Sequence, residues 1–326
     1  MIGAFGAIYL LWGSTYLAVA LALASVPPFL LMGARSIVGG LALLVAARAS
    51  GASAASGHTW VRATVCGLLL FVTCHGTLAC AQQHVPSGLA AVVLATIPLW
   101  IALINAIVPG GETPTSRQLC LLAPGFIGVA LIVSRQADAG SEAAVSGDLA
   151  LLVGAAASWA LGTILSERWS TSETAVAFSG MELTAGGTIL LIISAMLGEP
   201  ASFKLQAISA AALAGWVYLT VAGTIVAFAA YIWLLKQVSP TLVATYTFVN
   251  PIIAVLLGWA VLGERLNGVM AVGAVLVIGS VVGLLGARGS NRSVQRNSPQ
   301  YSARKSEMAR IEGSRAAQRY REGHCA

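Results

Sequence analysis

The sequence contains few charged residues: 18 Lys and Arg and 12 Asp and Glu make up 9% of its 326 residues. Soluble domains carry about 25% charged residues, so this chain has too little polar surface to fold in water. Hydrophobic residues make up 57% of the sequence. The shortage of charge therefore predicts that most of the chain lies in a lipid bilayer.

Motifs of several catalytic and binding chemistries are also missing. The five cysteines lack metal-ligand spacing and fit small apolar fillers better than a disulfide framework. There is no His-Glu-x-x-His sequence, no Asp in the interior of an apolar segment, and no Gly-rich loop that ends in Lys-Ser or Lys-Thr. We therefore expect no metal site, no cofactor and no enzymatic activity.

The net charge of +6 comes from the C-terminal tail. Residues 288–326 hold nine Lys and Arg against three Asp and Glu, whereas residues 1–287 hold nine of each. The tail is polar and rich in Ser and Arg, a composition typical of a disordered segment attracted to anionic lipid. The basic charge therefore gives no reason to expect a nucleic-acid partner.

Ten apolar segments are long enough to cross the hydrocarbon core, which takes about 17 to 20 helical residues. Helices are expected because they satisfy their backbone hydrogen bonds internally. Ten helices put both termini on one side of the membrane, and fourteen Lys and Arg on that side against three on the other favour the cytoplasm. The segments are 4–23, 28–47, 62–81, 88–108, 118–134, 148–166, 175–197, 210–235, 240–262 and 267–286.

The two halves of the chain resemble each other at fixed offsets. Each half has five segments, an odd number, so the second half crosses the membrane in the opposite orientation. We expect an all-α integral membrane protein with ten transmembrane helices in two inverted-topology repeats, residues 1–135 and 147–287, followed by a cytoplasmic tail, 288–326. The matching positions are Trp12 and Trp159, Gly33 and Gly180, Gly39 and Gly186, and Gly40 and Gly187 at an offset of 147, and Val85 and Val238, Leu89 and Leu242, Ala91 and Ala244, and Pro98 and Pro251 at an offset of 153.

Two charged residues lie well inside the apolar segments, Arg35 and Glu182, and they occupy equivalent positions of the repeat. A charge at the bilayer centre costs about 2.5–3.5 kcal/mol on insertion scales, so each needs a reason to be there. Two interpretations stay open. In the first, Arg35 binds an anionic group, and Glu182 binds a cationic group or carries a proton. In the second, the two residues form a structural ion pair between the halves.

Eight further residues are candidates for lining a central cavity or for coupling. His75 is a candidate proton relay because histidine titrates near neutral pH, and Asn250 precedes Pro251, which frees a carbonyl in the preceding turn. Helix packing or anchoring at the membrane interface is the structural alternative for the set. The eight are Trp12, Thr15, Tyr16, His75, Thr96, Trp159, Tyr246 and Asn250.

Several motifs together resemble a known family over nearly all of residues 1–287. They are Trp12-Gly13-Ser14-Thr15-Tyr16, Val85–Val93 with Ala95–Leu99, Val238-Ser239-Pro240 through Tyr246, Val249-Asn250-Pro251 with Ala254–Gly258, and Gly263-Glu264. On these motifs the chain resembles the drug/metabolite transporter superfamily, in its EamA family. The resemblance implies ten helices in two EamA repeats and export of small solutes across the bacterial inner membrane.

We therefore expect a secondary transporter that exports small metabolites or drug-like solutes by alternating access, with a small-molecule substrate and the bilayer as partners. Proton coupling through Glu182, exchange and uniport stay open, as does the oligomeric state. One alternative is a membrane scaffold that docks partners through its basic tail, which leaves Arg35 and Glu182 unexplained. The other is an intramembrane enzyme, although the sequence shows no nucleophile–base pair and no paired acids at membrane depth.

Overall fold

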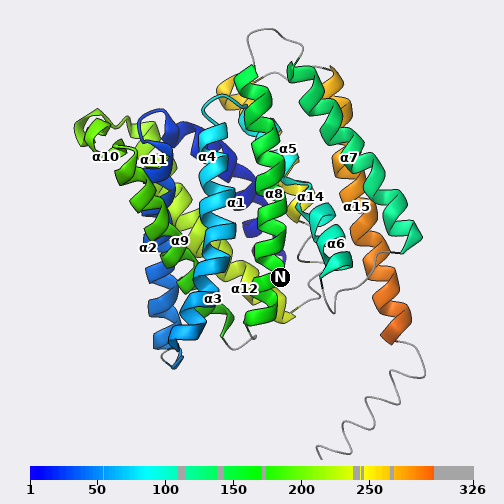
Figure 1. Cartoon of the computed structure of the whole chain (residues 1–326), viewed down its shortest axis with the longest axis horizontal. Coiled ribbons are helices and arrows are strands. Elements are labelled where there is room, and N and C mark those ends of the chain that lie inside the picture. Colours follow the sequence, from blue (N-terminus) through cyan, green and yellow to red (C-terminus); the bar gives the residue numbers. More distant parts are fainter. Residues whose placement is uncertain are drawn as a thin grey trace, which may run out of the picture. The chain divides into compact units, whose positions relative to one another are not determined.

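The computed structural model describes residues 1–53, 55–108, 115–137, 143–170, 174–237, 243, 246–264 and 268–296. Within these residues every regular element is a helix, and no strand occurs (Figure 1). The chain divides into two units, Met1–Leu284 and Leu285–Ala326. The first unit holds every candidate site residue and is described below by itself.

The described helices follow the order of the expected apolar segments. In the first half they are α1 (Ile2–Leu23), α2 (Pro28–Ala49), α3 (Gly57–Gly67), η1 (Leu68–Gly76), α4 (Thr77–Ala81), α5 (Ser87–Leu94), α6 (Ile97–Ile107) and α7 (Ser116–Ala137). In the second half they are α8 (Ala143–Trp169), α9 (Ala175–Met196), α10 (Glu199–Ser202), η2 (Leu205–Ala207), α11 (Ala210–Tyr218), η3 (Leu219–Val226), α12 (Ala227–Gln237), α14 (Tyr246–Leu257), η4 (Gly258–Leu262) and α15 (Gly268–Arg296).

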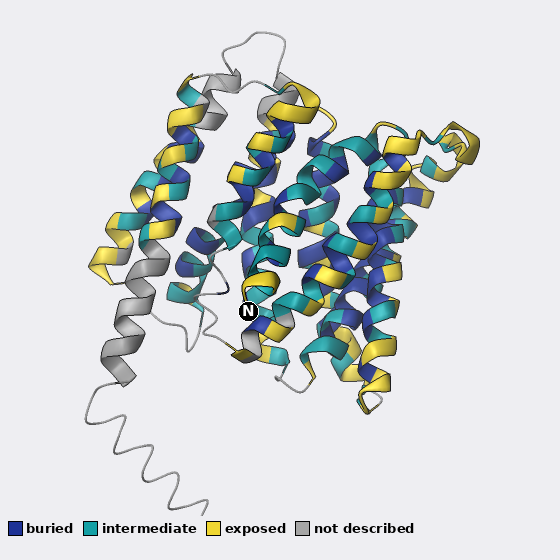
Figure 2. Cartoon of the chain, turned by 180° about the vertical axis from the view of Figure 1, so that it is seen from behind, coloured by how far each residue is buried: buried dark blue, intermediate teal, exposed yellow. Residues whose placement is uncertain are grey.

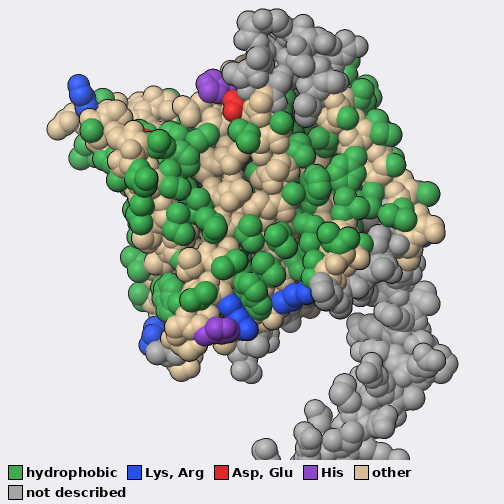
Figure 3. Space-filling model, in the orientation of Figure 1, with side chains coloured by type: hydrophobic (Ala, Val, Ile, Leu, Met, Phe, Trp, Pro, Cys, Tyr) green, Lys and Arg blue, Asp and Glu red, His purple; other side chains and the backbone are tan. Residues whose placement is uncertain are grey.

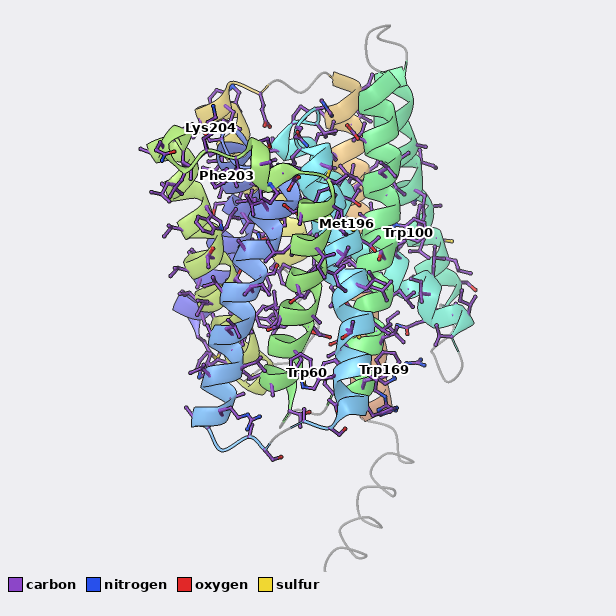
Figure 4. The ribbon with its side chains drawn as sticks, turned by 60° about the vertical axis from the view of Figure 1, so that its left-hand side comes forward. Trp60, Trp100, Trp169, Met196, Phe203 and Lys204 are labelled. Atoms are coloured by element: carbon purple, nitrogen blue, oxygen red, sulfur yellow. The ribbon has the colours of Figure 1, made fainter. Side chains whose placement is uncertain are left out.

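Seven helical stretches in the described residues are long and apolar enough to cross a membrane. Three shorter apolar helices, Leu119–Leu131, Val249–Leu262 and Ala271–Gly283, lie within the other three expected segments. Hydrophobic side chains cover the visible face of the bundle, while Lys, Arg and His gather toward its two ends (Figure 3). Trp60 and Trp169 lie toward one end and Phe203 and Lys204 toward the other (Figure 4), as expected for side chains at two membrane interfaces.

The exposed residues lie on helix faces that point away from the bundle (Figure 2), and many of them are large and apolar. Leu10 is 61% exposed and Trp259 is 66% exposed. In water a surface of this kind would be unfavourable, because burying apolar area is worth roughly 25 cal/mol per Å². The faces are therefore suited to lipid.

α2 and α9 pack against each other in antiparallel fashion along much of their length. A Cβ atom added to Gly40 would lie 2.9 Å from the carbonyl oxygen of Gly180, and one added to Gly187 would lie 3.0 Å from that of Gly33. Only glycine allows backbones to approach this closely. In the repeat Gly180 corresponds to Gly33 and Gly187 to Gly40. Exchanging the two halves therefore converts the contact of Gly40 with Gly180 into that of Gly187 with Gly33, as at a two-fold interface.

Several other contacts between helices of the two halves are also reciprocal. α1, the first helix of the first half, packs against α11, η3, α12 and α14, whereas α8, the first helix of the second half, packs against α3, η1, α4, α5 and α6. Likewise η3 contacts α2 and η1 contacts α9. The two halves therefore interlock, which is consistent with a two-repeat layout.

The third helix of each half widens into π-helical turns, which the sequence analysis did not anticipate. η1 lies between α3 and α4, and η3 lies between α11 and α12. A π-helix pairs each N–H with the carbonyl five residues back, which leaves a carbonyl free for other donors. The Ser158 hydroxyl donates to the Leu69 carbonyl (3.0 Å), and Trp12 Nε1 donates to the Gly223 carbonyl (2.9 Å). Each widened helix thus accepts a hydrogen bond from the first helix of the other half.

The expected segment 88–108 is divided into two helices, α5 and α6. Pro98 lies in the first turn of α6, where its missing N–H costs no helical hydrogen bond. The chain turns at Ala95 and Thr96, and α5 is buried over its whole length. Pro251, the equivalent proline of the second half, lies inside α14 without ending it.

Candidate functional site

Arg35 and Glu182 occupy matching places, each the eighth residue of its helix, on α2 and α9. Both side chains are buried, with 7% and 3% of their surface exposed. Although both belong to the described part of the chain, no ion pair joins them. Nε of Arg35 and Oε1 of Glu182 are buried without a hydrogen-bond partner. A structural ion pair therefore does not account for the two charges.

Arg35 lies near His75 of η1, close enough for its charge to act on the imidazole. The His75 ring packs against the rings of Trp159 and Phe71, with centroids 4.9 and 5.3 Å apart, and its Nδ1 has no partner. We call Arg35, Phe71, His75 and Trp159 the Arg35 group. It combines a guanidinium, which is suited to binding carboxylate or phosphate, with an imidazole and two aromatic rings.

Glu182 lies in a separate polar group. The side chains of Ser166, Cys66 and Ser179 lie beside its carboxylate, close enough to interact with it. Cys66 precedes His75 by nine residues on one continuous helix, about 13 Å at 1.5 Å per residue. We call these residues the Glu182 group, and it lies at a different depth in the bundle from the Arg35 group.

Trp12, on α1 of the first half, is the centre of a cluster with three aromatic rings of the second half. Its ring contacts those of Tyr246, Tyr231 and Phe228, with centroids 4.6, 5.3 and 6.4 Å apart. Tyr231 and Tyr246 also meet edge to face at 6.2 Å. These tilted and edge-to-face contacts are favourable for aromatic pairs, and they hold the Trp12 indole where it donates to the Gly223 carbonyl.

The two tryptophan clusters are equivalent under the repeat. Trp12 corresponds to Trp159 at the offset of 147, and His75 corresponds to Phe228 at the offset of 153. The pair of Trp159 and His75 thus matches the pair of Trp12 and Phe228. The first half places a titratable ring where the second half has a phenyl ring, and this difference makes the two clusters chemically distinct.

Tyr16 and Thr15 extend the Trp12 cluster along α1. Tyr16 is near Tyr246 and Cys74, with which its hydroxyl interacts electrostatically, and its carbonyl accepts a hydrogen bond from Gln82 Nε2 at 3.0 Å. Thr15 donates its hydroxyl hydrogen bond to the Trp12 carbonyl at 2.6 Å. The structure therefore brings Trp12, Tyr16 and Tyr246 together, while the Thr15 hydroxyl bonds within its own helix.

Thr96 and Asn250 lie apart from these groups in different environments. Thr96 is fully buried, and its hydroxyl donates to the Val93 carbonyl at 2.7 Å, which accounts for its polarity locally. Asn250 is 8% exposed, and its Oδ1 is buried without a partner. The Asn250 side chain therefore has an acceptor oxygen without a donor, whereas the Thr96 hydroxyl already bonds within its own segment of the chain.

Sequence reasoning missed the polar neighbours of Glu182. Ser179 precedes Glu182 by three residues, a spacing that places both on one helix face, so a local signal was available. Ser166 and Cys66 come from α8 and α3, and no local pattern relates them to Glu182. In the described residues no group of three or more His, Cys, Asp or Glu side chains is placed to hold a metal ion.

Comparison with protein families gives a match over most of the chain. The model of the EamA-like transporter family matches residues 1–134 and 146–286. The chain is 33% identical over 282 residues to the uncharacterized inner membrane transporter YedA of Escherichia coli (strain K12), covering 85% of this chain and 88% of that protein.

More distant relatives and a solved structure match a similar share of the chain at lower identity. Protein PecM of Dickeya dadantii (strain 3937) is 27% identical over 274 residues, covering 83% of this chain and 87% of its own. The uncharacterized transporter YvbV of Bacillus subtilis (strain 168) is 26% identical over 272 residues, with 83% and 87% coverage. A protein crystal structure superposes with a TM-score of 0.60 at 22% identity, covering 86% of this chain and 95% of that one, which shows a shared fold.

Proposed function

Because the chain belongs to the EamA-like transporter family, we propose that it is a secondary transporter exporting small metabolites or drug-like solutes by alternating access. The name of its Escherichia coli relative places that protein in the inner membrane, and we propose the same location here. The lipid-suited outer faces of the helices support a multi-pass protein.

We propose that ten helices form two inverted repeats, residues 1–135 and 147–287, with both termini and the tail 288–326 in the cytoplasm. The support is the reciprocal packing of the halves, above all the glycine contact between α2 and α9, which two-fold exchange reproduces. Transporters with inverted repeats open a central site alternately to each side because the halves exchange conformations.

The observation that carries the transport proposal is the pair of buried, unpaired charged atoms on Arg35 and Glu182. A buried charge without a partner is costly, so a ligand that supplies one explains why it is retained. In this proposal Arg35 binds an anionic group of the substrate, with His75 near it and Trp159 packed on His75, and Trp12, Tyr16, Tyr246 and Asn250 line the path.

We propose that Glu182 is the coupling residue and carries a proton. It is the one carboxylate within the described spanning helices whose side chain is buried at mid-helix, and hydroxyl and thiol groups surround it. A carboxyl group in this setting can exchange a proton when the end of the bundle nearest to it opens. Binding of a cationic substrate group at Glu182 is the alternative role.

Transport by purified protein in liposomes tests these roles together. Uptake of a mixed metabolite pool would be measured with and without an imposed pH gradient, for the wild type, Glu182→Gln and Arg35→Ala. We expect gradient-driven accumulation in the wild type, loss of the gradient effect in Glu182→Gln, and at least a tenfold loss of uptake in Arg35→Ala, about 1.4 kcal/mol of binding.

Thr188→Ser is the matched control, because it keeps a hydroxyl that bonds to its own helix on an exposed face, and it should transport at the wild-type rate. Accumulation that survives in Glu182→Gln would assign coupling elsewhere. Absence of movement of any solute by folded wild-type protein would contradict the transport proposal.

A further inference from the structure

A carboxylate from the second half of the chain covers the start of α5 in the first half. The backbone N–H groups of Ser87 and Gly88 donate to Oε1 and Oε2 of Glu264 at 2.7 and 3.0 Å. The first N–H groups of a helix have no partner within it. Gly263 has φ 67°, a left-handed conformation that turns the chain after η4 and brings Glu264 back onto α5.

A second carboxylate makes the same kind of contact at the start of α2. The backbone N–H groups of Phe29 and Leu30 donate to Oε1 and Oε2 of Glu199 at 3.3 and 2.8 Å. Glu199 follows α9, and the chain turns toward α2 at Gly198, where φ is 73°. Both carboxylates thus belong to connections of the second half, and both helix starts belong to the first half.

These contacts lie at one end of the bundle together with a third link. His84, in the turn between α4 and α5, pairs with Asp148 of α8, with 2.8 Å between Nδ1 and Oδ2. A Cβ atom added to Gly76 would lie 3.1 Å from the Leu190 side chain and 3.3 Å from the Phe29 ring. The end of η1 therefore lies beside the start of α2 and the last turns of α9, at the same end of the bundle. In Figure 1 α10, α4 and α5 accordingly lie toward the same end.

We infer that Glu264 and Glu199 are gate residues, whose bonds to the helix starts close this end of the transporter and break when it opens. Carboxylates at helix N-termini gain charge-assisted hydrogen bonds and a favourable interaction with the helix dipole. The bonds join the two halves, so movement of α5 away from Glu264, or of the start of α2 away from Glu199, breaks them. The inference rests on the proposed alternating access, and it adds the contacts that hold one end shut.

Cys74 and Cys66 are natural reporters for the opening of this end. Cys74 is 1% exposed and packs in the same apolar cluster as Leu89 and Val92 of α5. Cys66 is fully buried in the other main cluster, beside Glu182. Opening at α5 should therefore expose Cys74 to water while Cys66 stays protected.

Reaction of each cysteine with a charged, water-soluble maleimide tests the inference without any substrate. The labelling rate would be followed at each cysteine by mass spectrometry of the full-length protein in detergent. Loss of a helix cap changes an equilibrium by a factor of about 5 to 30, so Glu264→Gln and Glu199→Gln should each label Cys74 about 5- to 30-fold faster than the wild type. Glu264→Asp keeps the charge but shortens the side chain, and should give a smaller increase.

Lys204→Gln is the control, since it removes an exposed charge at the same end (Figure 4) without touching a helix start. The inference would be overturned if Cys74 were labelled at the wild-type rate in all three Glu variants. It would also be overturned if Cys66 were labelled faster together with Cys74, because that result indicates general unfolding. If the wild type takes up no solute into liposomes but the Glu variants label Cys74 faster, the transport proposal is contradicted and the gate is not. If the wild type takes up solute but the variants label Cys74 at the wild-type rate, the gate is contradicted and transport is not.

Discussion

Single glycines set how closely the two halves approach. At Gly40 an added Cβ atom would meet Thr184 Oγ1 at 2.5 Å, the Thr184 backbone nitrogen at 2.7 Å and the Gly180 carbonyl at 2.9 Å. Two of these atoms are backbone and cannot turn aside, so any side chain here must separate α2 from α9. The position equivalent to Gly40 is Gly187, which is restricted in the same way by Gly33.

We expect Gly40→Ala to lower the free energy of unfolding by about 1–3 kcal/mol, the usual cost of overpacking, and the thermal midpoint in detergent by several degrees. Gly154→Ala, in α8, is the matched control because nothing lies within 4 Å of its added Cβ atom. Alanine is the better helix former by about 1 kcal/mol, so this control should unfold at the wild-type temperature or above. Equal midpoints for the two variants would contradict the close contact.

Among the elements, the π-helical turns η1 and η3 depend on donors from outside their own helix. Trp12 supplies one to η3 through its indole nitrogen, and Ser158 supplies one to η1 through its hydroxyl. Each donor belongs to the first helix of the other half, so the two widened helices are stabilised only when the halves are assembled. The sequence of either helix alone does not contain these partners, which is why the widening was not predicted.

Trp12→Phe should remove the hydrogen bond to Gly223 while retaining an aromatic ring in the cluster. Leaving a part-buried carbonyl without its donor costs about 1–3 kcal/mol, and the thermal midpoint should fall accordingly. Trp259→Phe makes the same chemical change at a side chain that is 66% exposed and should leave the midpoint within error. A Trp12→Phe protein as stable as the wild type would mean that η3 does not need this donor.

For the whole molecule, the proposed orientation in the membrane rests on the distribution of Lys and Arg. The proposal of ten helices places the tail in the cytoplasm and the segment between α9 and α11 outside. Lys204 is exposed in that segment, and the native Cys325 lies in the tail.

In intact spheroplasts, an impermeant maleimide should label Lys204→Cys but not Cys325, and permeabilised cells should label both. Each position would be tested with the other cysteines replaced by serine. The two sites serve as controls for each other, because a leaky preparation labels both at once. Labelling of Cys325 in intact cells would reverse the orientation or change the number of spans.

The sequence by itself determined the membrane class, the family and the duplication of the chain. Apolar segments, glycines and motif residues are local or periodic features, and the equivalence of Arg35 and Glu182 follows from a constant offset. Only the tertiary structure decided that the two charges do not pair and that His75 and Trp159 accompany one while Ser166 and Cys66 accompany the other. The contacts of Glu264 and Glu199 with helix starts more than 150 residues away likewise depend on the tertiary structure. These partners come from different helices, and their contacts depend on how the helices pack rather than on spacing along any one of them.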